Sequence, residues 1–370
     1  MPETTTQSLI SVSKNLHAGD LEMAGSALTP TCDTPWSVRM VRLHGGRQEG
    51  VDLVVIDNGR LTIRLCPTRG MGVIDVVSGD LRLGWDSPVK EIVHPAFMEL
   101  GRRRGFGWLE GFNEFVVRCG LEQLGPPGED SHHGAVGEPP VGDLTLHGKI
   151  ANIPASEVEV EVLHEPPYTL TVRGVVNEFA MFGPKLELHT ELSIQPGSTR
   201  FEITDTITNR GGQTQEMALL YHINQGRPLL EDGARLVADV ANAQPRDAGY
   251  SEQAIAQYKH FGPPAPGTPE QVFYLDLSPD EAGRCAVGLY NAAKDRGLTV
   301  SWPKQQLPEF ALWKALMDER DAYVTGLEPC VTLPNPRPVE REAGRLVSLE
   351  PEGSYEASLR FELQTGLPEH

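Results

Sequence analysis

The sequence predicts an all-β protein whose strands pair antiparallel in a large sandwich with few short helices. Three observations predict this class. About eighteen short strand-type runs follow one another without alternating helices, which excludes a βαβ architecture. The segment Lys185–Ile194 alternates polar and apolar residues over its whole length, as half-buried antiparallel strands do. Finally, the 38 Gly and 30 Pro among 370 residues favour a chain rich in turns.

Strand-type patterning begins near residue 36. The predicted strands of the N-terminal part are Trp36–Leu43, Val51–Asp57, Leu61–Cys66, Val73–Val77, Glu157–Leu163, Thr169–Val176, Lys185–Ile194 and Arg200–Asn209. Two connections are indicated by their residue types. Asn58-Gly59 predicts a tight hairpin, and Pro196-Gly197 predicts the turn between the last two strands of this group.

The same patterning continues to the C-terminal end. The predicted strands there are Gln215–Tyr221, Arg235–Ala241, Gln271–Leu275, Arg284–Tyr290, Leu298–Trp302, Tyr323–Leu327, Gly344–Leu349 and Ser354–Leu363. Short helical turns are expected only within Pro88–Glu99 and Asp247–His260. Residues 1–35 are polar and weakly patterned, and they predict an N-terminal extension. Residues 36–370 predict a single sandwich domain, because strand patterning resumes unchanged beyond each long loop.

Charge and cysteine content narrow the function classes. The 51 acidic against 32 basic residues give a formal net charge of −19, which argues against nucleic acid and anionic membranes as partners. No apolar stretch approaches the roughly 20 residues of a membrane-spanning helix. The first thirty residues hold one basic residue and no apolar block, so no secretory signal is expected. The five cysteines are too widely spaced for a metal knuckle or a disulfide framework, which predicts a reducing, cytoplasmic setting.

Several motifs of common enzyme classes are absent from the sequence. It has no Walker A, HExxH or GxSxG pattern. The glycines at 105, 107 and 111 have the wrong spacing for a dinucleotide-binding turn. His132-His133 lies in a Gly- and Pro-rich loop, where histidines are more often solvated than metal-bound.

Three strand ends combine a titratable residue with glycine or proline. His147 precedes Gly148, whose missing Cβ would allow the backbone to approach a ligand. His222 ends one strand, with Asn224 close behind, and Glu328 ends another strand before a proline. Taken singly, such a histidine is more often structural, and such a glutamate usually lies in a surface turn. Together, two imidazoles and one carboxylate supply the parts for paired general acid and base catalysis near neutral pH.

The motifs around these residues resemble those of the aldose 1-epimerase (galactose mutarotase-like) superfamily, and more closely its little-characterised bacterial branch. The shared patterns are LHGxxxNxPA around His147, LYHxNxGxPLL around His222 and YVxGLEP around Glu328. Residues 68–71, 83–88 and 111–121 fit the same branch, so the likeness covers roughly residues 37–363. The resemblance implies the β-supersandwich fold of that superfamily, which agrees with the strand pattern.

The resemblance also implies roles for individual residues. His222 is expected to be the general acid and Glu328 the general base, while His147 and Arg69 are expected to bind the substrate. Further substrate-binding residues are predicted to be Asn224, Trp313, Lys314 and Arg118. The family's substrate-gripping aspartate has no clear match. Asp276 is a distant candidate for it, and the Trp313-Lys314 pair is another occupant of that space. No cofactor and no metal are required.

The implied reaction is mutarotation of a monosaccharide or a sugar derivative. The acid and the base must face each other across one small site, because the anomeric hydroxyl and the ring oxygen are bonded to the same carbon. In this scheme His222 is protonated at rest and Glu328 is ionised. Trp313 or Trp108 would pack against the apolar face of the sugar.

The sequence is also compatible with other interpretations. Arg102–Arg104 is either a solvated loop or a clamp for an acidic or phosphorylated sugar. The same fold could carry another sugar epimerase or isomerase, a lyase, or a carbohydrate-binding protein without catalysis. A metal site built from His147, His222 and Glu328 is a further alternative. The predicted partner is a small carbohydrate, and neither its identity nor the oligomeric state follows from the sequence.

Overall fold

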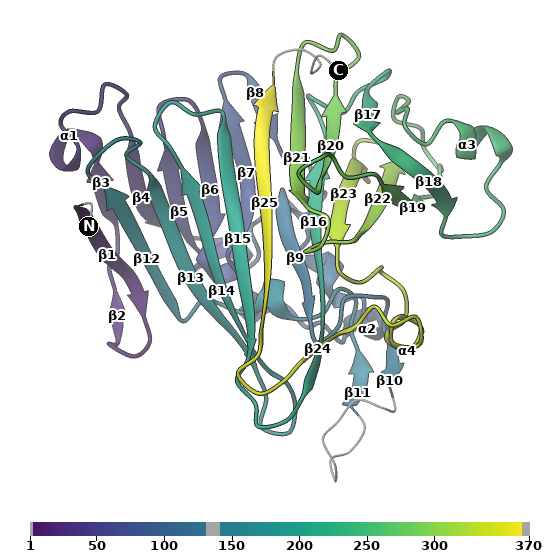
Figure 1. The fold of residues 1–370 in the computed structure, drawn as a ribbon, viewed down its shortest axis with the longest axis horizontal. Helices are drawn as coiled ribbons and strands as arrows, with labels where there is room; N and C mark the ends of the chain where they lie inside the picture. Colours follow the sequence, from purple (N-terminus) through teal and green to yellow (C-terminus); the bar gives the residue numbers. More distant parts are fainter. Residues whose placement is uncertain (1–2, 131–140, 365–370) are drawn as a thin grey trace.

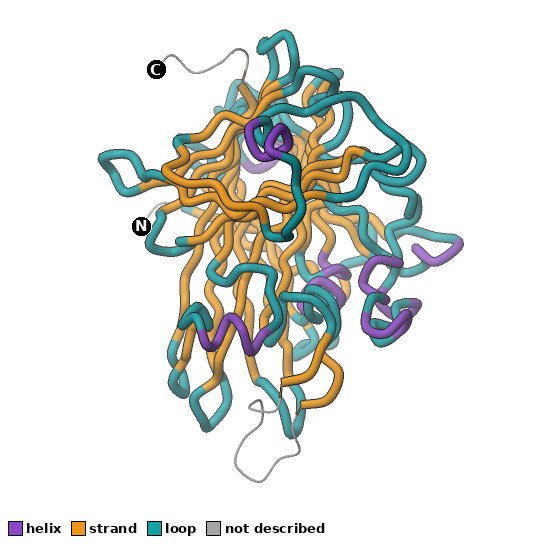
Figure 2. The backbone as a smooth tube through the Cα atoms, turned by 90° about the vertical axis from the view of Figure 1, so that its right-hand side faces the viewer, coloured by secondary structure: helices purple, strands orange, loops and turns teal. Residues whose placement is uncertain are grey.

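The computed structural model describes residues 3–130 and 141–364 of the chain. Within them, two large antiparallel sheets pack face to face, which confirms the predicted all-β sandwich (Figure 1). Strands are the main regular element of the backbone, and the helices are short pieces in the connecting loops (Figure 2). In this described part, no helix is long and apolar enough to cross a membrane.

One sheet has ten strands and forms one face of the sandwich. From edge to edge its strands are β17 (Arg235–Ala238), β20 (Arg284–Tyr290), β21 (Gly297–Pro303), β25 (Ser354–Gln364), β15 (Arg200–Asn209), β14 (Lys185–Ile194), β13 (Leu170–Phe179), β12 (Glu157–Leu163), β1 (Thr4–Ser11) and β2 (Leu16–His17). Its solvent face is polar where the strands alternate strictly, as in β14.

The other sheet has thirteen strands and carries the candidate site. Along its main path the strands are β18 (Val240–Pro245), β19 (Gln271–Leu277), β22 (Glu309–Leu316), β23 (Tyr323–Cys330), β16 (Gln215–Gln225), β9 (Val116–Leu121), β7 (Gly72–Ser78), β6 (Thr62–Cys66), β5 (Asp52–Asp57), β4 (Ser37–Arg42) and β3 (Leu21–Ala24). Off this path, β8 (Leu81–Leu83) pairs with β7 and β24 (Val347–Leu349) pairs with β16. A separate two-stranded sheet pairs β10 (Gly128–Asp130) antiparallel with β11 (Val141–Leu144).

The helices are few, as the sequence predicts. In the described residues they are α1 (Gly25–Leu28), α2 (Arg102–Gly105), α3 (Glu252–Ala256) and α4 (Arg337–Glu342), with short 3-10 turns at Gly46–Gln48, Pro67–Arg69, Pro95–Phe97, Gly107–Glu110 and Ile150–Asn152. Both predicted helical regions hold such a piece. Asp247–His260 contains α3, whose first turn is capped by the Ser251 side chain, and Pro88–Glu99 contains a 3-10 turn.

The two predicted turns form for the expected reasons. Asn58-Gly59 joins β5 to β6, and Gly59 has a φ of 82°, which only glycine adopts readily. The Asn58 side chain accepts hydrogen bonds from the backbone N–H groups of Arg60 and Leu61, closing the hairpin. Pro196-Gly197 lies in the connection between β14 and β15, which pair in register.

Strands within residues 4–24 belong to both sheets although this part of the sequence is polar. β1 pairs with β12 at one side of the ten-stranded sheet, and β3 pairs with β4 at the end of the thirteen-stranded sheet. Antiparallel strands near the end of a sheet can have one covered and one solvated face, so a polar composition is compatible with them. The predicted extension over residues 1–35 therefore contributes strands to both sheets, and the division of the chain into domains remains a prediction.

The core lies between the two sheets. One hydrophobic cluster includes buried side chains of both, such as Leu192 and Phe361 from the ten-stranded sheet and Ile63 and Leu219 from the thirteen-stranded sheet. Burial of this apolar surface is the main driving force that holds the sheets together. All five cysteines are free, in agreement with the predicted absence of disulfides.

Two strands beside the candidate site lack a sequence signal. β9 and β22 were not among the predicted strands, and β16 and β23 extend beyond their predicted ends. All residues of β9 and of β23 are buried, and β16 is buried from Met217 onward. A strand covered on both faces shows no polar–apolar alternation, so its pattern cannot be distinguished from that of any other apolar run.

Candidate active site

The centre of the site is a pair of side chains on two neighbouring strands, His222 of β16 and Glu328 of β23. The register pairs Leu220 with Cys330 and Asn224 with Gly326, which places His222 directly opposite Glu328. Their Nε2 and Oε1 atoms lie 3.2 Å apart, and both side chains are almost completely buried. The buried Glu328 Oε1 atom makes no hydrogen bond.

Gly326 provides the space that the pair occupies. A Cβ at this position would lie 2.5 Å from Glu328 Oε1 and 3.0 Å from His222 Cε1. Any larger residue would push the carboxyl group and the imidazole apart. The glycine of the GLEP motif is therefore required by the geometry of the site, without any need for a positive φ.

Asn224 fixes the tautomer of His222. Its side-chain nitrogen donates to the backbone carbonyls of Glu114 (3.0 Å) and His222 (3.2 Å), so its oxygen must face the imidazole. That oxygen lies 2.5 Å from His222 Nδ1, which therefore carries the hydrogen, assigned here from the network. Nε2 is left free to accept or donate a proton toward Glu328. Asn224, predicted to bind substrate, has both of its polar ends engaged with the protein.

His147 enters the site from the loop after β11. Its φ is 57°, a left-handed conformation, and its Nδ1 lies 2.9 Å from the backbone carbonyl of Leu124. Nδ1 must therefore be the donor, which leaves Nε2 as an acceptor. The His147 and His222 rings lie 5.6 Å apart. The sequence predicts that the adjacent Gly148 lets the backbone approach a ligand. In the structure, its backbone instead packs against the Gly120 and Gln123 carbonyls.

Aromatic side chains surround the two imidazoles. The ring of Phe112 lies 5.2 Å from His222, that of Trp313 lies 5.3 Å from His222, and that of Trp108 lies 4.6 Å from His147. Trp313 is half-buried, and its indole nitrogen donates to Glu270 at 2.8 Å. The indole nitrogen of Trp108 is buried without a hydrogen-bond partner. Such apolar walls with a few polar groups are typical of sites that bind the faces of small rings.

Burial sets the charges of the three titratable groups. Desolvation lowers the pKa of His222 to about 3, with a further contribution from nearby His147. It lowers the pKa of His147 to about 4, and it raises the pKa of Glu328 to about 8. At neutral pH both imidazoles are therefore neutral and Glu328 is protonated. These charges are opposite to the expected resting state with a protonated His222 and an ionised Glu328, because burial disfavours the charged form of both groups.

Arg69 has internal partners for its guanidinium group. It is 1% exposed, its Nη2 lies 2.6 Å from Glu114 Oε1, and its Nη1 donates to the backbone carbonyls of Val93 and Gly111. These contacts tie together loops beside the site. None of the contacts described for Arg69 joins it to His222, His147 or Glu328, and its role in substrate binding stays a prediction.

Arg118 and Lys314 lie on the opposite face of the thirteen-stranded sheet. Arg118 pairs with Tyr221 in register, next to His222, so the two point away from the His222 face. Arg118 Nε and Nη2 contact Asp205 at 2.5 and 2.8 Å. Lys314 follows Trp313 in β22, and its Nζ donates to the backbone carbonyls of Tyr258 and His260. Alternation along a strand thus separates Trp313, which reaches the site, from Lys314, which does not.

The remaining candidates lie elsewhere or outside the described residues. Asp276 pairs with Lys304 at 2.8 Å, and no contact joins it to the site. Arg102 pairs with Glu99 at 2.7 Å, whereas Arg103 and Arg104 are exposed. The turn that carries them is attached beside His147, because the Leu146 N–H donates to the Gly105 carbonyl. His132-His133 lies outside the described residues.

Two residues near the site, Glu270 and Arg246, have no motif of their own in the sequence, whereas Phe112 lies in the segment 111–121 that fits the bacterial branch. Phe112 contacts His222, and Glu270 holds Trp313 and lies beside Arg246 at 3.4 Å. Glu270 and Arg246 come from loops near β18 and β19, and only the fold brings them to β22. Among the described residues, no group of three or more His, Cys, Asp or Glu side chains is arranged to hold a metal ion.

Solved structures of other proteins share this fold. A structure from Klebsiella pneumoniae subsp. pneumoniae, of a protein assigned provisionally as an aldose 1-epimerase, is 36% identical with a TM-score of 0.92, and the match covers 98% of this chain and 92% of that one. A galactose mutarotase-like protein from Clostridium acetobutylicum is 12% identical with a TM-score of 0.59, over 87% of this chain and 97% of that one, which shows the fold alone. No curated protein matches the sequence.

The sandwich and the match at 36% identity define the class of protein as galactose mutarotase-like. Residues 48–363 match the model of a family described as a domain of unknown function, DUF4432. The chain belongs to this family. The predicted membership of the aldose 1-epimerase superfamily is confirmed, whereas the activity is not thereby established.

Proposed function

We propose that the protein is an aldose 1-epimerase-like isomerase that interconverts the anomers of a monosaccharide or a close derivative. The observation that carries the proposal is the His222–Glu328 pair, with Nε2 and Oε1 3.2 Å apart in a buried aromatic site. Mutarotation needs one group that donates a proton and one that accepts a proton on two oxygens of the same carbon. A non-catalytic carbohydrate-binding protein would not need such a pair.

His222 and Glu328 can together catalyse a reversible ring opening, because one accepts a proton while the other donates one. In the neutral resting state, His222 Nε2 takes the proton from the C1 hydroxyl while the Glu328 carboxyl protonates the ring oxygen. The bond between C1 and the ring oxygen breaks, and the open-chain aldehyde forms. Rotation about C1–C2 then exposes the other face, and both transfers run in reverse. Each positioned transfer is worth about 10²–10⁴ in rate.

In this scheme, the protonation state that the family resemblance implies appears after ring opening. After ring opening, His222 is protonated and Glu328 is ionised, which is the state expected from the family. The two residues thus exchange the roles of acid and base within one cycle, and they always share a single proton. The state that binds the cyclic sugar is the neutral one, because burial favours it.

The other side chains supply binding. His147 Nε2 is an acceptor for a sugar hydroxyl, and the unpaired Trp108 indole N–H is a donor. Phe112 and Trp313 can pack against apolar C–H faces of the ring. A clamp for an acidic or phosphorylated sugar at Arg102–Arg104, a cytoplasmic location, and binding by Arg69 remain parts of the proposal.

Removal of either member of the pair tests the proposal. Glu328→Gln and His222→Ala should each lower the rate of anomer interconversion by about 10²-fold or more, because each removes one proton transfer. The rate is measured by NMR exchange spectroscopy on a panel of aldoses and sugar acids, and unfolding curves check that the variants fold. Glu356→Gln and His189→Ala, on the ten-stranded sheet, are the matched controls.

The same panel discriminates the alternatives. Retained interconversion in both folded variants would rule out this mechanism. Sugar binding without any acceleration in the wild-type protein would favour a non-catalytic binding protein. Formation of a different sugar product would favour another isomerase or a lyase on the same fold.

A further inference from the structure

A second cavity lies at one side of the ten-stranded sheet and shares no lining residue with the candidate active site. Its volume is about 290 Å³. The residues that line it are Arg235, Leu236, Val237, Ala238, Lys259, His260, Tyr290 and Lys294. Three of these are Lys or Arg, one is His260 and none is acidic, although the chain has 51 acidic residues against 32 Lys plus Arg. We call this cavity the basic pocket.

The fold brings these basic side chains together from three segments. Arg235 of β17 lies between Tyr290 of β20 and His260, with which it forms an isolated bridge. The backbone of Lys259 is fixed to β17 because its carbonyl accepts from the Leu236 N–H at 2.8 Å. Lys294 is held in the β20–β21 turn, where its N–H donates to the Asn291 carbonyl.

The buried Lys314 stabilises one wall of the basic pocket. Its Nζ donates to the carbonyl of Tyr258 at 3.2 Å and to that of His260 at 2.8 Å. These bonds fix the segment that carries Lys259 and His260. The geometry therefore gives Lys314 a place behind the basic pocket and not in the candidate active site.

The charges of the basic pocket are not neutralised within the described residues. The side chains of Arg235 and Lys294 form no hydrogen bond or ion pair there, and the Lys259 Nζ makes one hydrogen bond, to the Ala238 carbonyl at 3.1 Å. Arg296, two residues from Lys294, shows the contrast, because it pairs with Asp80 at 2.9 Å. Several unpaired cations around one hollow favour a multiply charged anion.

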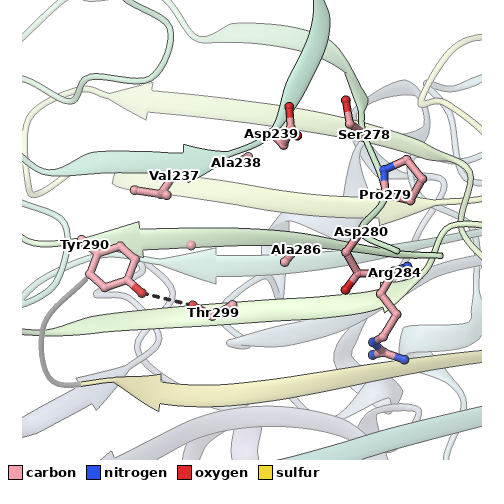
Figure 3. A pocket seen from close by; sticks show the side chains of 11 residues that line it. Val237, Ala238, Asp239, Ser278, Pro279, Asp280, Arg284, Ala286, Tyr290 and Thr299 are labelled. Atoms are coloured by element: carbon pink, nitrogen blue, oxygen red, sulfur yellow. Dashed lines mark hydrogen bonds between the residues drawn. The ribbon is translucent and has the colours of Figure 1, made fainter. Parts of the chain in front are cut away.

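A larger groove continues from the basic pocket across the sheet. It shares Val237, Ala238 and Tyr290 with the basic pocket and has a volume of about 440 Å³. Figure 3 shows small side chains on its floor, with Ser278, Asp280 and Arg284 toward one end. Groups that can bond hydroxyls are thus available next to an apolar floor, in a volume within the roughly 300–1,000 Å³ of ligand sites.

We propose that the basic pocket and this groove form an accessory site for a phosphate monoester of a small polyhydroxy compound. The guanidinium of Arg235 suits two phosphate oxygens at once, and Lys259 and Lys294 approach the dianion from the other segments. The polyhydroxy part lies over Tyr290 in the groove. This inference does not depend on the mutarotase assignment, because the two sites share no lining residue.

Calorimetric titration of the full chain at low ionic strength tests the site, with glucose 6-phosphate, inorganic phosphate and glucose as probes. Glucose 6-phosphate should bind, and the double variant Arg235→Gln/Lys294→Gln should weaken its binding by about tenfold or more, because charge-assisted hydrogen bonds are lost. The matched control Lys14→Gln/Arg39→Gln removes two exposed cations elsewhere and should leave the affinity unchanged.

The outcomes separate the parts of the proposal. Tighter binding of glucose 6-phosphate than of inorganic phosphate supports occupation of the groove, whereas equal affinity overturns that part. No binding of either phosphate, or an equal affinity for the wild-type protein and the Arg235→Gln/Lys294→Gln variant, overturns the site. The interconversion rate of glucose anomers in this variant is a separate readout, so a failure of the proposed enzymatic function does not affect the result.

Discussion

At the scale of single residues, the protonation of the central pair depends on the groups behind it. Asn224 holds the hydrogen of His222 on Nδ1, and the surrounding aromatic side chains exclude the water that would stabilise charge. The pair is therefore active when it shares one proton. It gains a second proton as the pH falls toward the pKa of His222, and it loses its only proton as the pH rises past that of Glu328.

An additional negative charge at position 224 should shift the pH dependence of kcat/KM. The pKa of His222 is about 3 and that of Glu328 about 8, so kcat/KM should be bell-shaped between these limits. Asn224→Asp places a carboxylate against the Nδ1–H of His222, which should raise the pKa of His222. The pH at which kcat/KM falls on the acidic side should therefore rise by about 1–3 units. The measurement is kcat/KM for anomer interconversion against pH. Asn224→Ala should lower the rate without raising that pH, and an unchanged pH in Asn224→Asp would contradict the positioning role.

At the scale of the elements, the site depends on four strands that lie side by side. β9, β16, β23 and β22 are consecutive neighbours in the thirteen-stranded sheet. Their alternation assigns His222, Glu328 and Trp313 to one face and Arg118, Tyr221 and Lys314 to the other. A sequence motif places residues close in the chain, but it does not show on which face of a strand each side chain lies.

Gly326 of β23 gives a test at this scale. Gly326→Ala should displace the Glu328 carboxyl, because the new Cβ would lie 2.5 Å from Oε1. The interconversion rate should fall by about 10²-fold, as expected for misplacement of a reacting group by about 1 Å. Gly128→Ala in β10 is the matched control, since a Cβ there meets nothing within 4 Å. Wild-type kcat/KM in a folded Gly326→Ala variant would show that the close packing around the pair is not needed.

At the scale of the whole molecule, a buried ion pair connects the two sheets. Arg118 of β9 contacts Asp205 of β15, and the Tyr221 hydroxyl of β16 donates to the same carboxylate at 2.7 Å. Thr190 of β14 accepts from Arg118 at 2.7 Å. The network lies in the apolar layer between the sheets, where an unpaired charge is costly.

Loss of one partner of this network should destabilise the whole sandwich. Arg118→Ala leaves Asp205 buried and uncompensated, so the free energy of unfolding should drop by about 3–5 kcal/mol in denaturant titrations. Arg118→Met/Asp205→Asn removes both charges and should be less destabilised. Because Arg118 faces away from His222, the KM for the sugar should stay unchanged in the folded double variant. A raised KM with little loss of stability would instead support the predicted substrate-binding role.

The sequence by itself determined the class of fold and the central pair of residues. Strict alternation identified half-buried strands such as β12 and β14, whose predicted bounds agree with the structure. The motifs identified His222 and Glu328, which the structure places opposite each other inside β16 and β23 and not at the predicted strand ends. These signals are local, because they depend on residues close together in the chain.

Only the tertiary structure decided which other residues reach that pair. β9 and β22 are invisible to alternation because both of their faces are largely covered. Burial reverses the resting protonation that the motifs implied, since desolvation depends on all surrounding segments. Phe112 and Glu270 join the site, and Arg118 and Lys314 turn away from it, through strand pairing between distant parts of the chain.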